Sequence, residues 1–405
     1  MISQRYNRQL YPPYYVIYNC WLLKNNKLIH TNDHIFFAPK IFIDKKTDIA
    51  NNKHNALMNI PAKRWTKKGP PKKILAIRMQ AMGDVVGTLP YLQDLRKSLP
   101  ASTKLDFLTR EETEGIPKNI FLFNKVFSIG GGRNFKKIML HTFLLLPKLF
   151  IQRYDVIIDL QNNIISEMVR KILLPKAWSA FDRYSPISGA ERYRLTIEAV
   201  GISMNKADNH FHLKHPHSGL AILRNNGWTG NDLVVLNPAA AFETRNWNIN
   251  NYVVFAKLWL NEFPHTQFLV LGVPFIAKKA AFLEEQLGSK LINLVEKTTP
   301  SEALSILQQV KLVLSEDSAL MHMAWCSGIP TFALFGGTRS DWSRPLGEHT
   351  FFLDSSDLPC GNCMLAVCKY GDVHCMTRYT PEQVFHHAIE LIQKLQNKHK
   401  SIIAE

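Results

Sequence analysis

The stretch Val310–Thr338, VKLVLSEDSALMHMAWCSGIPTFALFGGT, shows most directly how this chain folds. Its first five residues, 310–314, form an apolar run that is typical of a buried parallel strand. Residues 320–326 have the spacing of a helix, which a glycine and a proline end before the next apolar run begins. Asp317 and Ser318 therefore lie where a strand ends and a helix starts, at the edge of an open parallel sheet where ligands bind.

Two interpretations of this turn are open. Asp and Ser are the usual N-caps of helices, so on its own the turn is better explained as a cap than as a binding site. The exposed N–H groups and the dipole of a helix start also favour an anion such as a diphosphate. A second stretch of the same kind is needed to choose between the two.

Lys73–Pro90, KILAIRMQAMGDVVGTLP, has the same order of strand, turn and helix. Gly83 allows a tight turn and the close approach of a ligand. Leucines at helical spacing follow between residues 89 and 99. Pro90 lacks the N–H that a helix needs, so we expect the helix to be kinked there or to start after Asp84. The stretch is neither a P-loop nor a G-x-G-x-x-G motif.

Short apolar runs and amphipathic segments alternate along the rest of the chain. Such βα units predict parallel sheets with helices on both faces, and hence an α/β fold. A break near residues 210–232 divides the units into two halves. Further strands are expected at 105–108, 156–160, 233–236 and 267–271, and helices at 164–173, 191–200, 252–263, 277–287 and 302–309.

Four segments carry a resemblance to a known family. They are ILAIRMQAMGDVVGTLPYLQDLRKSLP (74–100), YDVIIDLQNN (154–163), LNPAAAFETRNWNINNY (236–252) and LSEDSALMHMAWCSGIPTFALFG (314–336). In this order they resemble the motifs of glycosyltransferase family 9, the ADP-heptose:lipopolysaccharide heptosyltransferases. The resemblance runs from about Lys73 to near Leu395. It implies a GT-B glycosyltransferase fold, in which two Rossmann-like domains face each other across a cleft.

The resemblance and the break divide the chain into three parts. Residues 71–215 are expected to form the acceptor domain, and residues 216–405 the nucleotide-sugar donor domain. Residues 1–70 are expected to be a small β-rich extension and linker, with alternation such as that of 35–43. This extension is rich in aromatic residues. Up to Lys73 the chain holds 14 Lys and Arg against 3 Asp and Glu, which is +11 of the formal net charge of +16.

A basic segment of this kind attracts anionic surfaces: phosphorylated lipid A–core, phospholipid or nucleic acid. A solvated face and linker explain it equally well. Nucleic acid is not expected as a partner, because no known nucleic-acid module is visible. No stretch reaches the roughly 18 apolar residues of a membrane span, and the first ten residues lack the apolar core of a signal peptide. We therefore expect a cytoplasmic protein with peripheral contact to the anionic inner face of the inner membrane.

A second candidate for membrane contact is Phe135–Arg153, FKKIMLHTFLLLPKLFIQR. The segment is apolar in the middle and basic at both ends, as a helix at a membrane interface would be. Pro147 is expected to break it, so the segment is not expected to span a bilayer. A core helix of the first domain is the alternative, and it explains the pattern slightly better.

The chemistry of sugar transfer indicates one residue as the base. The acceptor hydroxyl must lose its proton as it attacks the anomeric carbon, and a carboxylate at the cleft can take that proton. Asp84 matches the catalytic Asp of the family, so the resemblance implies that Asp84 is the general base of an inverting, metal-independent transfer. A helix N-cap is the other interpretation of Asp84, and the two roles are compatible. Met82, Gly83 and Gly87 are expected near the cleft.

The leaving diphosphate gains negative charge, which cations and backbone N–H groups stabilise. Arg245 aligns with the phosphate-binding Lys of the family, and an Arg keeps the charge but changes the geometry of contact. His322 matches a family His near the donor, although such a residue alone is more often part of a core. The resemblance implies a donor site of Arg245, Gly272, Asp317, Ser318, Ala319, Leu320 and His322, with the N–H groups of 318–320 on the phosphates.

The sequence departs from the family pattern at five positions near the donor. Asn237 stands where the family often has His, and Ala239 and Ala241 stand where it usually has Gly and Ser or Thr. Ala319 replaces the usual Gly, and Phe275 replaces a common acidic residue. These differences concern the identity of the sugar donor more than the fold.

The other acidic residues near the motifs of the first half are not interpreted as catalytic or metal-binding. No D-x-D pair that would hold Mg²⁺ on a nucleotide sugar stands near the motifs, so no cofactor is expected for catalysis. Asp155 and Asp159 are interpreted as structural. Asp159, Gln161 and Asn162 are weak candidates for the acceptor side.

Four of the six cysteines are clustered as Cys360-x2-Cys363-x4-Cys368-x6-Cys375. In a reducing compartment such a cluster is more typical of a metal site than of disulfides, and Zn²⁺ or iron would suit four thiolates. Similar segments occur at this place in the family, and some relatives carry iron there. Metal binding and free thiols are equal alternatives. A four-thiolate site would be structural, because it leaves no open coordination position.

Three functions follow from these observations. The favoured one is an inverting heptosyltransferase of the lipopolysaccharide inner core that uses ADP-heptose. The second is a family 9 enzyme with another nucleotide sugar or a protein acceptor. The third is a non-catalytic binding protein of GT-B fold, against which the intact Asp84, Arg245 and Asp317 argue. A sugar-nucleotide epimerase is disfavoured because its motifs are absent.

Overall fold

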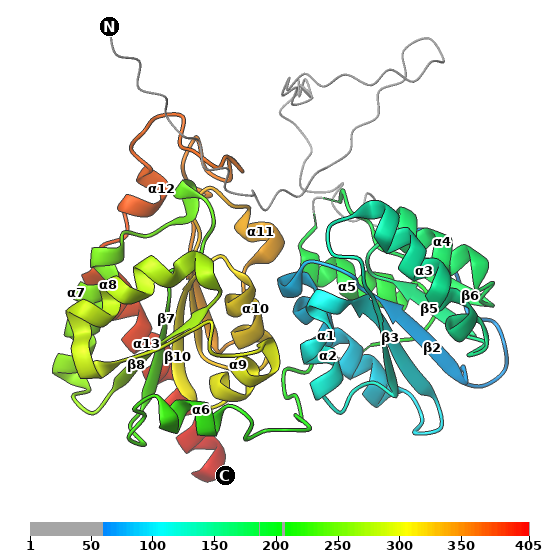
Figure 1. The fold of residues 1–405 in the computed structure, drawn as a ribbon, viewed down its shortest axis with the longest axis horizontal. Helices are drawn as coiled ribbons and strands as arrows, with labels where there is room; N and C mark the ends of the chain where they lie inside the picture. The colour runs from blue at the N-terminus through cyan, green and yellow to red at the C-terminus, as the bar shows by residue number, and fades with distance from the viewer. Residues whose placement is uncertain (1–59, 186, 205–206, 405) are drawn as a thin grey trace, which may run out of the picture. The chain divides into compact units, whose positions relative to one another are not determined.

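A computed structural model describes residues 60–185, 187–204 and 207–404 (Figure 1). The predicted extension as far as residue 59, including the strands expected near 35–43, lies outside the described residues. The described part contains two six-stranded sheets with helices between successive strands. The predicted α/β fold with two parallel sheets is confirmed.

The first sheet has the strand order β1-β6-β5-β2-β3-β4, and all its pairs are parallel except that of β1 with β6. Ala62 of β1 pairs with Ser179, so two residues of the expected extension and linker belong to this sheet. The strands are β1 (Ala62–Lys63), β2 (Lys73–Ile77), β3 (Lys104–Arg110), β4 (Lys125–Ile129), β5 (Val156–Asp159) and β6 (Ala177–Ala180). The helices are α1 (Met82–Ser98), α2 (Gly115–Asn119), α3 (Phe135–Phe150), α4 (Ile164–Ile172) and α5 (Gly189–Glu198).

The second sheet has the order β12-β11-β10-β7-β8-β9 and is parallel throughout. Its strands are β7 (Leu233–Asn237), β8 (Gln267–Gly272), β9 (Leu291–Val295), β10 (Val310–Glu316), β11 (Thr331–Leu334) and β12 (Thr350–Leu353). The helices are α6 (Leu220–Asn225), α7 (Ile249–Glu262), α8 (Ala277–Leu287), α9 (Pro300–Leu307), α10 (Ala319–Cys326), α11 (Ser340–Ser343), α12 (His374–Thr377) and α13 (Pro381–Ala404).

The strand order places the candidate site. Apart from the edge strands, both sheets have the same order, in which the first strand lies between the second and the fourth: β2 next to β5, and β7 next to β10. Ligands of such sheets bind outside the carboxyl ends of the strands where the order reverses. Asp84 follows β2 and Asp317 follows β10, and each of these strands is one of the central pair at which the order of its sheet reverses.

Apolar side chains fill the central strands, as expected where helices cover both faces of a sheet. Residues 74–77 of β2 and 233–236 of β7 are fully buried. α1 packs against α10, and buried residues of both sheets form one continuous apolar core. This contact joins the first sheet to the second beside the two turns that carry Asp84 and Asp317.

Most elements expected from the sequence are confirmed to within about three residues, which is the usual uncertainty of such boundaries. One of the two alternatives for α1 is wrong: the helix does not start after Asp84 but at Met82, and it continues through Pro90. The burial of Leu89, Leu92 and Leu95 explains this, because tertiary packing outweighs the lost hydrogen bond.

The expectation that a proline breaks the segment 135–153 is also wrong. α3 continues through Pro147 to Phe150. Pro147 is exposed, so the carbonyl that loses its helical partner can bind water instead. Among the described helices, none is both long and apolar enough to cross a bilayer.

Candidate active site

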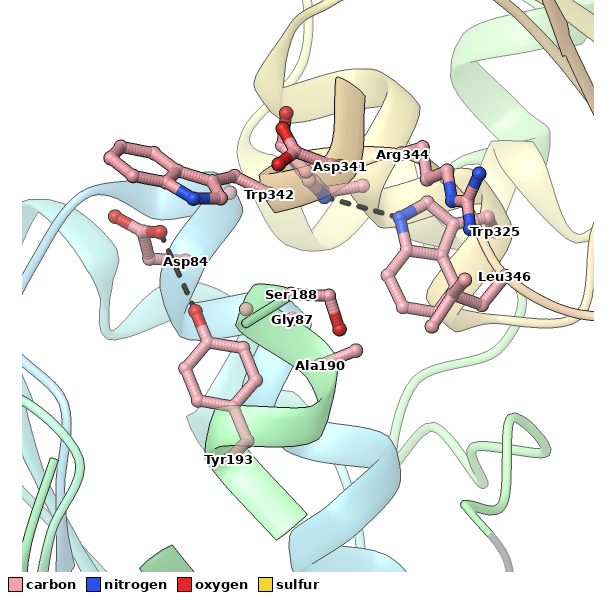
Figure 2. A pocket seen from close by; sticks show the side chains of 14 residues that line it. Asp84, Gly87, Ser188, Ala190, Tyr193, Trp325, Asp341, Trp342, Arg344 and Leu346 are labelled. Carbon is pink, nitrogen blue, oxygen red and sulfur yellow. Dashed lines mark hydrogen bonds between the residues drawn. The ribbon is translucent and has the colours of Figure 1, made fainter. Parts of the chain in front are cut away.

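A pocket opens where α1 and α5 of the first sheet meet α10 and α11 of the second (Figure 2). It contains four residues expected from the sequence: Gly83, Asp84, Gly87 and His322. The structure thus brings the expected base together with a histidine of the expected donor site. The other lining residues are Ser188, Gly189, Ala190, Tyr193, Trp325, Asp341, Trp342, Ser343, Arg344 and Leu346.

The carboxylate of Asp84 is held from three directions. Oδ1 lies 3.0 Å from a guanidinium nitrogen of Arg78. Oδ2 accepts a hydrogen bond from the N–H of Ala81 at 2.9 Å, which gives Asp84 the capping role at the start of α1. The hydroxyl of Tyr193 donates to Oδ1 at 3.5 Å, as Figure 2 shows. The side chain of Asp84 is nevertheless 47% exposed, so a substrate hydroxyl can reach it.

The surroundings of Asp84 favour its ionised form. Partial burial works against ionisation, but the guanidinium of Arg78 and the N–H of Ala81 outweigh it and lower the pKa of Asp84 below its ordinary value. Arg78 is only 8% exposed, and its guanidinium lies 5.3 and 5.5 Å from the ring centres of Phe181 and Tyr193. Asp84 is therefore a proton acceptor throughout the neutral pH range.

The starts of α1 and α10 meet at this pocket. A Cβ placed on Gly83 would lie 2.7 Å from Cδ2 of His322 and 3.5 Å from Cα of Ala319. Each helix start carries a partial positive charge. Two such charges converge beside Asp84, and together they favour an anion such as a diphosphate.

His322 lies in the first turn of α10 and is neutral. Its Nδ1 accepts a hydrogen bond from the indole N–H of Trp325 at 3.1 Å, so the proton of the neutral ring is on Nε2. Burial lowers the pKa of His322, although the carboxylates of Asp317 and Asp84 act in the opposite direction. The ring can therefore donate a hydrogen bond through Nε2 at neutral pH.

The cap interpretation of the second turn is confirmed. Oγ of Ser318 accepts a hydrogen bond from the N–H of Met321 at 3.3 Å, and Ala319 is the first residue of α10. Nδ2 of Asn237 donates to Oγ of Ser315 and of Ser318 at 2.8 and 2.7 Å. Asn237, which replaces a family His, thus ties the carboxyl ends of β7 and β10 together.

Arg245 ends the short 3₁₀ turn η2 (Glu243–Arg245). Its guanidinium lies 3.5 Å from Oδ2 of Asp317 and 4.7 Å from the ring centre of Phe242. Neither Arg245 nor Asp317 lines the pocket of Asp84. The ion pair stands beside that pocket, because Asp317 immediately precedes the cap of α10.

Two expected site residues contribute less to this arrangement. Gly272 is the last residue of β8, where a Cβ would lie 2.6 Å from Cδ1 of Ile276, and it does not line the pocket. Met82 begins α1 and is half-buried against the core.

Glu316 holds the segment that carries Arg245. Its side chain is fully buried; Oε2 accepts a hydrogen bond from the N–H of Ala240 at 2.8 Å, and Oε1 accepts one from that of Trp247 at 2.7 Å. Burial raises the pKa of Glu316 to about 7, although the ammonium of Lys279 and the two N–H groups act against the shift. One carboxylate at the end of β10 therefore fixes both ends of the 240–247 segment.

The sequence interpretation missed Arg78, Glu316 and Tyr193. Arg78 and Glu316 lie inside the quoted stretches, each a charged residue at the end of a buried apolar strand. A charge in such a place needs a partner, and this signal was available from the sequence. Tyr193, like Trp342, belongs to no motif, and only the fold brings these side chains to the pocket.

The weak acceptor-side candidates support the turn before α1. Oε1 of Gln161 accepts hydrogen bonds from the N–H groups of Met79 and Gln80 at 2.9 and 3.2 Å. Asp159 is fully buried, and its Oδ1 accepts hydrogen bonds from the N–H groups of Gln161 and Asn162 at 3.1 and 2.7 Å. These contacts agree with the structural interpretation of Asp159.

The four clustered cysteines are free thiols. The thiol of Cys375 donates to the carbonyl of Thr244 at 3.7 Å, next to Arg245. Burial, together with the other three thiols of the cluster, raises the pKa of Cys375 to about 11. Among the residues that the structure describes, no three His, Cys, Asp or Glu side chains are arranged to hold one ion. The chemistry of the four thiols suits Zn²⁺ or iron, but their arrangement does not form such a site.

Comparison with known proteins identifies relatives of the chain. The family model described as glycosyltransferase family 9 (heptosyltransferase) matches residues 144–374. Lipooligosaccharide heptosyltransferase 2 of Campylobacter jejuni serotype O:2 is 27% identical over 250 residues, which cover 60% of this chain and 76% of that protein.

Solved structures share the fold. The family 9 glycosyl transferase of Veillonella parvula aligns with a TM-score of 0.69 and 18% identity over 80% of this chain and 97% of that one. The Escherichia coli heptosyltransferase WaaC, solved with ADP-2-deoxy-2-fluoro heptose, aligns with a TM-score of 0.58 and 18% identity over 78% and 99% of the two chains. The GT-B fold expected from the sequence is thereby confirmed.

Proposed function

This chain belongs to glycosyltransferase family 9, and we propose that it transfers heptose from ADP-heptose to the inner core of lipopolysaccharide. The name of the Campylobacter relative supports heptose as the sugar and a lipooligosaccharide type of acceptor. The observation that carries the proposal is the position of Asp84, which is ionised beside Arg78 and lines one pocket with His322 of α10.

Asp84 acts as general base in a single displacement. The acceptor hydroxyl gives its proton to the carboxylate, and its oxygen forms a bond to the anomeric carbon while the bond from that carbon to the diphosphate breaks. ADP leaves with the electron pair, and the anomeric configuration is inverted. The N–H of Ala81 and the guanidinium of Arg78 orient the carboxylate, so that its exposed oxygen faces the acceptor.

The residues around the start of α10 receive the leaving diphosphate. The N–H groups of Ser318, Ala319 and Leu320, the helix dipole and the Nε2–H of His322 donate to phosphate oxygens. Arg245 adds the cation, and in the bound state it exchanges part of its contact with Asp317 for a phosphate oxygen. No metal ion is required, because these groups carry the developing charge.

Replacing Asp84 by Asn tests the base. Asp84→Asn should abolish transfer while ADP-heptose binding, measured by calorimetry, stays within a few-fold of the wild type. Asp341→Asn is the matched control: Asp341 is another carboxylate of the pocket, but it pairs with Arg339. The control should keep its turnover. Normal turnover in Asp84→Asn would contradict the assignment.

A different nucleotide sugar is the second candidate. Ala239 is larger than the Gly that the family usually has there, and Ala241 lacks the hydroxyl of the usual Ser or Thr. Phe275, which is 56% exposed after β8, stands where the family commonly has an acidic residue. Titration of ADP-heptose beside other ADP, UDP and GDP sugars tests this. Selective binding of another sugar would keep the mechanism and change the donor. No binding to the folded protein would support a binding protein without catalysis.

We propose a structural role for the cysteine segment. It is attached to η2 through the carbonyl of Thr244, so it supports the turn that carries Arg245. Zn²⁺ or iron at Cys360, Cys363, Cys368 and Cys375 stays a prediction from the sequence, and elemental analysis of the purified protein tests it.

The proposed acceptor determines where the enzyme works. A lipid A–core acceptor is anchored in the inner membrane, so we propose peripheral action at its cytoplasmic face, without nucleic acid as a partner.

A further inference from the structure

Helix α3 buries only one of its faces. Ile138, Thr142, Leu146 and Leu149, spaced three or four residues apart, are buried in the first domain. This confirms the interpretation of segment 135–153 as a helix that packs on the core. It leaves the opposite face of the helix to be explained.

That opposite face is also apolar. Leu140, Phe143, Leu144 and Ile151 are between 52% and 74% exposed, and their spacing places them in one row along the helix. We call these four residues the α3 apolar face. Single exposed apolar residues are normal on any protein, but a continuous row is typical of an interaction site.

The neighbouring helix extends this surface. α4 packs beside α3, as Figure 1 shows, and it ends near two further exposed apolar residues. Ile172 is 38% exposed and Leu174 is 78% exposed. Two exposed apolar residues thus lie at the end of the helix that neighbours α3.

Basic residues border the α3 apolar face at both ends. Lys136 and Lys137 lie in the first turn of α3, and Lys148 lies in its last turn. All three are exposed, and the segment 133–154 contains no Asp or Glu. On α4 the acidic Glu167 already pairs with Lys171 at 2.7 Å.

A basic hollow lies just beyond the end of α3. It is lined by Arg153 together with Lys72, Lys73, Lys104 and Lys176. The acidic member of its lining, Asp155, contacts the ammonium of Lys176 at 2.6 Å and accepts hydrogen bonds from two backbone N–H groups, so it is already neutralised. Positive charge therefore continues from the helix onto the adjoining surface.

We propose that the α3 apolar face docks on the surface of an anionic phospholipid bilayer. The helix lies in the plane of the interface, where Phe143 and Leu144 enter the boundary between headgroups and acyl chains. The lysines at both ends of α3 contact lipid phosphates. The proposal rests on the proposed function in one respect: a lipid-anchored acceptor is what the enzyme would meet there.

The charges argue against a second copy of this chain as the occupant. A two-fold dimer through this face would bring the lysines of one α3 near those of the other, without acidic residues of 133–154 to pair with them. A bilayer rich in anionic lipid instead satisfies the apolar row and the bordering charges together.

Vesicle binding of the full-length protein tests the proposal. We would measure sedimentation with vesicles of phosphatidylcholine alone and of phosphatidylcholine mixed with phosphatidylglycerol. The wild type should bind the anionic vesicles, and Leu144→Glu should weaken this binding about tenfold or more. Phe121→Glu is the matched control, because Phe121 is 70% exposed in the turn between α2 and β4, and this variant should bind like the wild type.

Charge variants test the second half of the proposal. The double variant Lys136→Gln/Lys137→Gln should lose affinity for anionic vesicles and show a weaker dependence on salt. The double variant Lys257→Gln/Lys278→Gln removes two exposed lysines from α7 and α8. It should keep the affinity for anionic vesicles and the salt dependence of the wild type. Because the basic first 59 residues are present throughout, binding that is unchanged in Leu144→Glu and in Lys136→Gln/Lys137→Gln would overturn the proposal.

Two further measurements separate this proposal from its alternatives. Light scattering of wild type and Leu144→Glu should give the same mass; a loss of dimers in the variant would assign the face to a second copy and overturn the proposal. Transfer to a detergent-dispersed acceptor should be the same in Leu144→Glu and wild type. If the wild type shows no heptose transfer but the vesicle results hold, the proposed function fails and the membrane face stands.

Discussion

Gly83 and His322 face each other at the contact of α1 with α10 so closely that a Cβ on the glycine would lie 2.7 Å from Cδ2 of the imidazole. Real Cβ contacts are almost never this short, so one of the two helices or the ring would have to move. Gly83 thus sets how near α1 and His322 can come. Because Gly83 has no side chain, α1 can approach His322 closely at the residue that precedes Asp84.

Replacing Gly83 by Ala should therefore impair the reaction more than the fold. The added methyl group would displace His322, and we expect transfer to fall by about tenfold or more while the melting temperature changes little. Gly87→Ala is the matched control, because its Cβ would lie 3.4 Å from Cε2 of Tyr193, an ordinary contact. Equal activity in the two variants would show that the approach of α1 to His322 does not matter.

Arg78 should control the acid side of the pH dependence. It lowers the pKa of Asp84, so kcat/KM of the wild type should stay level as the pH falls from about 7 to about 5. In Arg78→Gln the pKa of Asp84 rises, and the rate should begin to fall at a higher pH. Arg78→Lys keeps the charge, so its pH profile should lie between those of the wild type and Arg78→Gln. Superimposable pH profiles would remove Arg78 from the mechanism.

Arg245 should matter for the donor. Arg245→Ala removes a cation and leaves Asp317, which is 10% exposed, without this ion-pair partner beside the proposed phosphate site. We expect the Kd for ADP-heptose to rise by about ten- to a hundredfold, with a smaller rise in Arg245→Lys. Arg224→Ala on α6 removes an exposed arginine elsewhere and serves as the control. Calorimetry measures all three, and an unchanged Kd in Arg245→Ala would place the phosphates somewhere else.

Glu316 should make stability depend on pH. Its pKa is raised from 4.5 to about 7 by burial, so the folded protein holds this proton more tightly than the unfolded chain does. The resulting stabilisation is complete below about pH 4.5 and is lost as the pH rises through about 7. Relative to Glu316→Gln, the free energy of unfolding of the wild type should fall by on the order of 3 kcal/mol across this range. Urea titrations at several pH values measure it.

A control separates Glu316 from the general titration of the protein. Glu285→Gln changes an exposed carboxyl of α8 and should keep the pH dependence of the wild type. If the wild type and Glu316→Gln have parallel curves, burial does not raise the pKa of Glu316 above that of the unfolded chain.

Transfer should not depend on a divalent cation. Because helix N-termini and Arg245 are proposed to stabilise the leaving diphosphate, we expect kcat in EDTA to lie within about twofold of kcat in Mg²⁺. Radiolabelled or mass-spectrometric assays of heptose transfer measure this. A strict requirement for added Mg²⁺ would mean that the donor-side groups named above are insufficient.

The sequence allowed the two strand–turn–helix units to be found because both signals are local. An apolar run, a small or polar turn and a helical repeat are read within about 25 residues, and β2–α1 and β10–α10 both follow this pattern. Four of the expected site residues line one pocket, because both helices start at the carboxyl end of a strand that lies where the order of its sheet reverses.

Other features depend on contacts that are distant in the sequence. The short β1, which pairs with Ser179 of β6, has no pattern long enough to be recognised. Tyr193 reaches Asp84 from more than a hundred residues away. Local propensity left open whether α1 passes through Pro90 or starts after Asp84, because it gives no weight to the buried leucines around Pro90.

The hydrogen bond from Trp325 to His322 gives the protein an optical reporter of its own site. Indole fluorescence shifts when the partner of the N–H changes, and Trp325 lines the pocket while bonding to the ring that is proposed to meet the donor. The chain has eight tryptophans, so the spectrum of Trp325→Phe must be subtracted to isolate this one. The difference signal would then follow each nucleotide sugar as it enters, in real time and without a label.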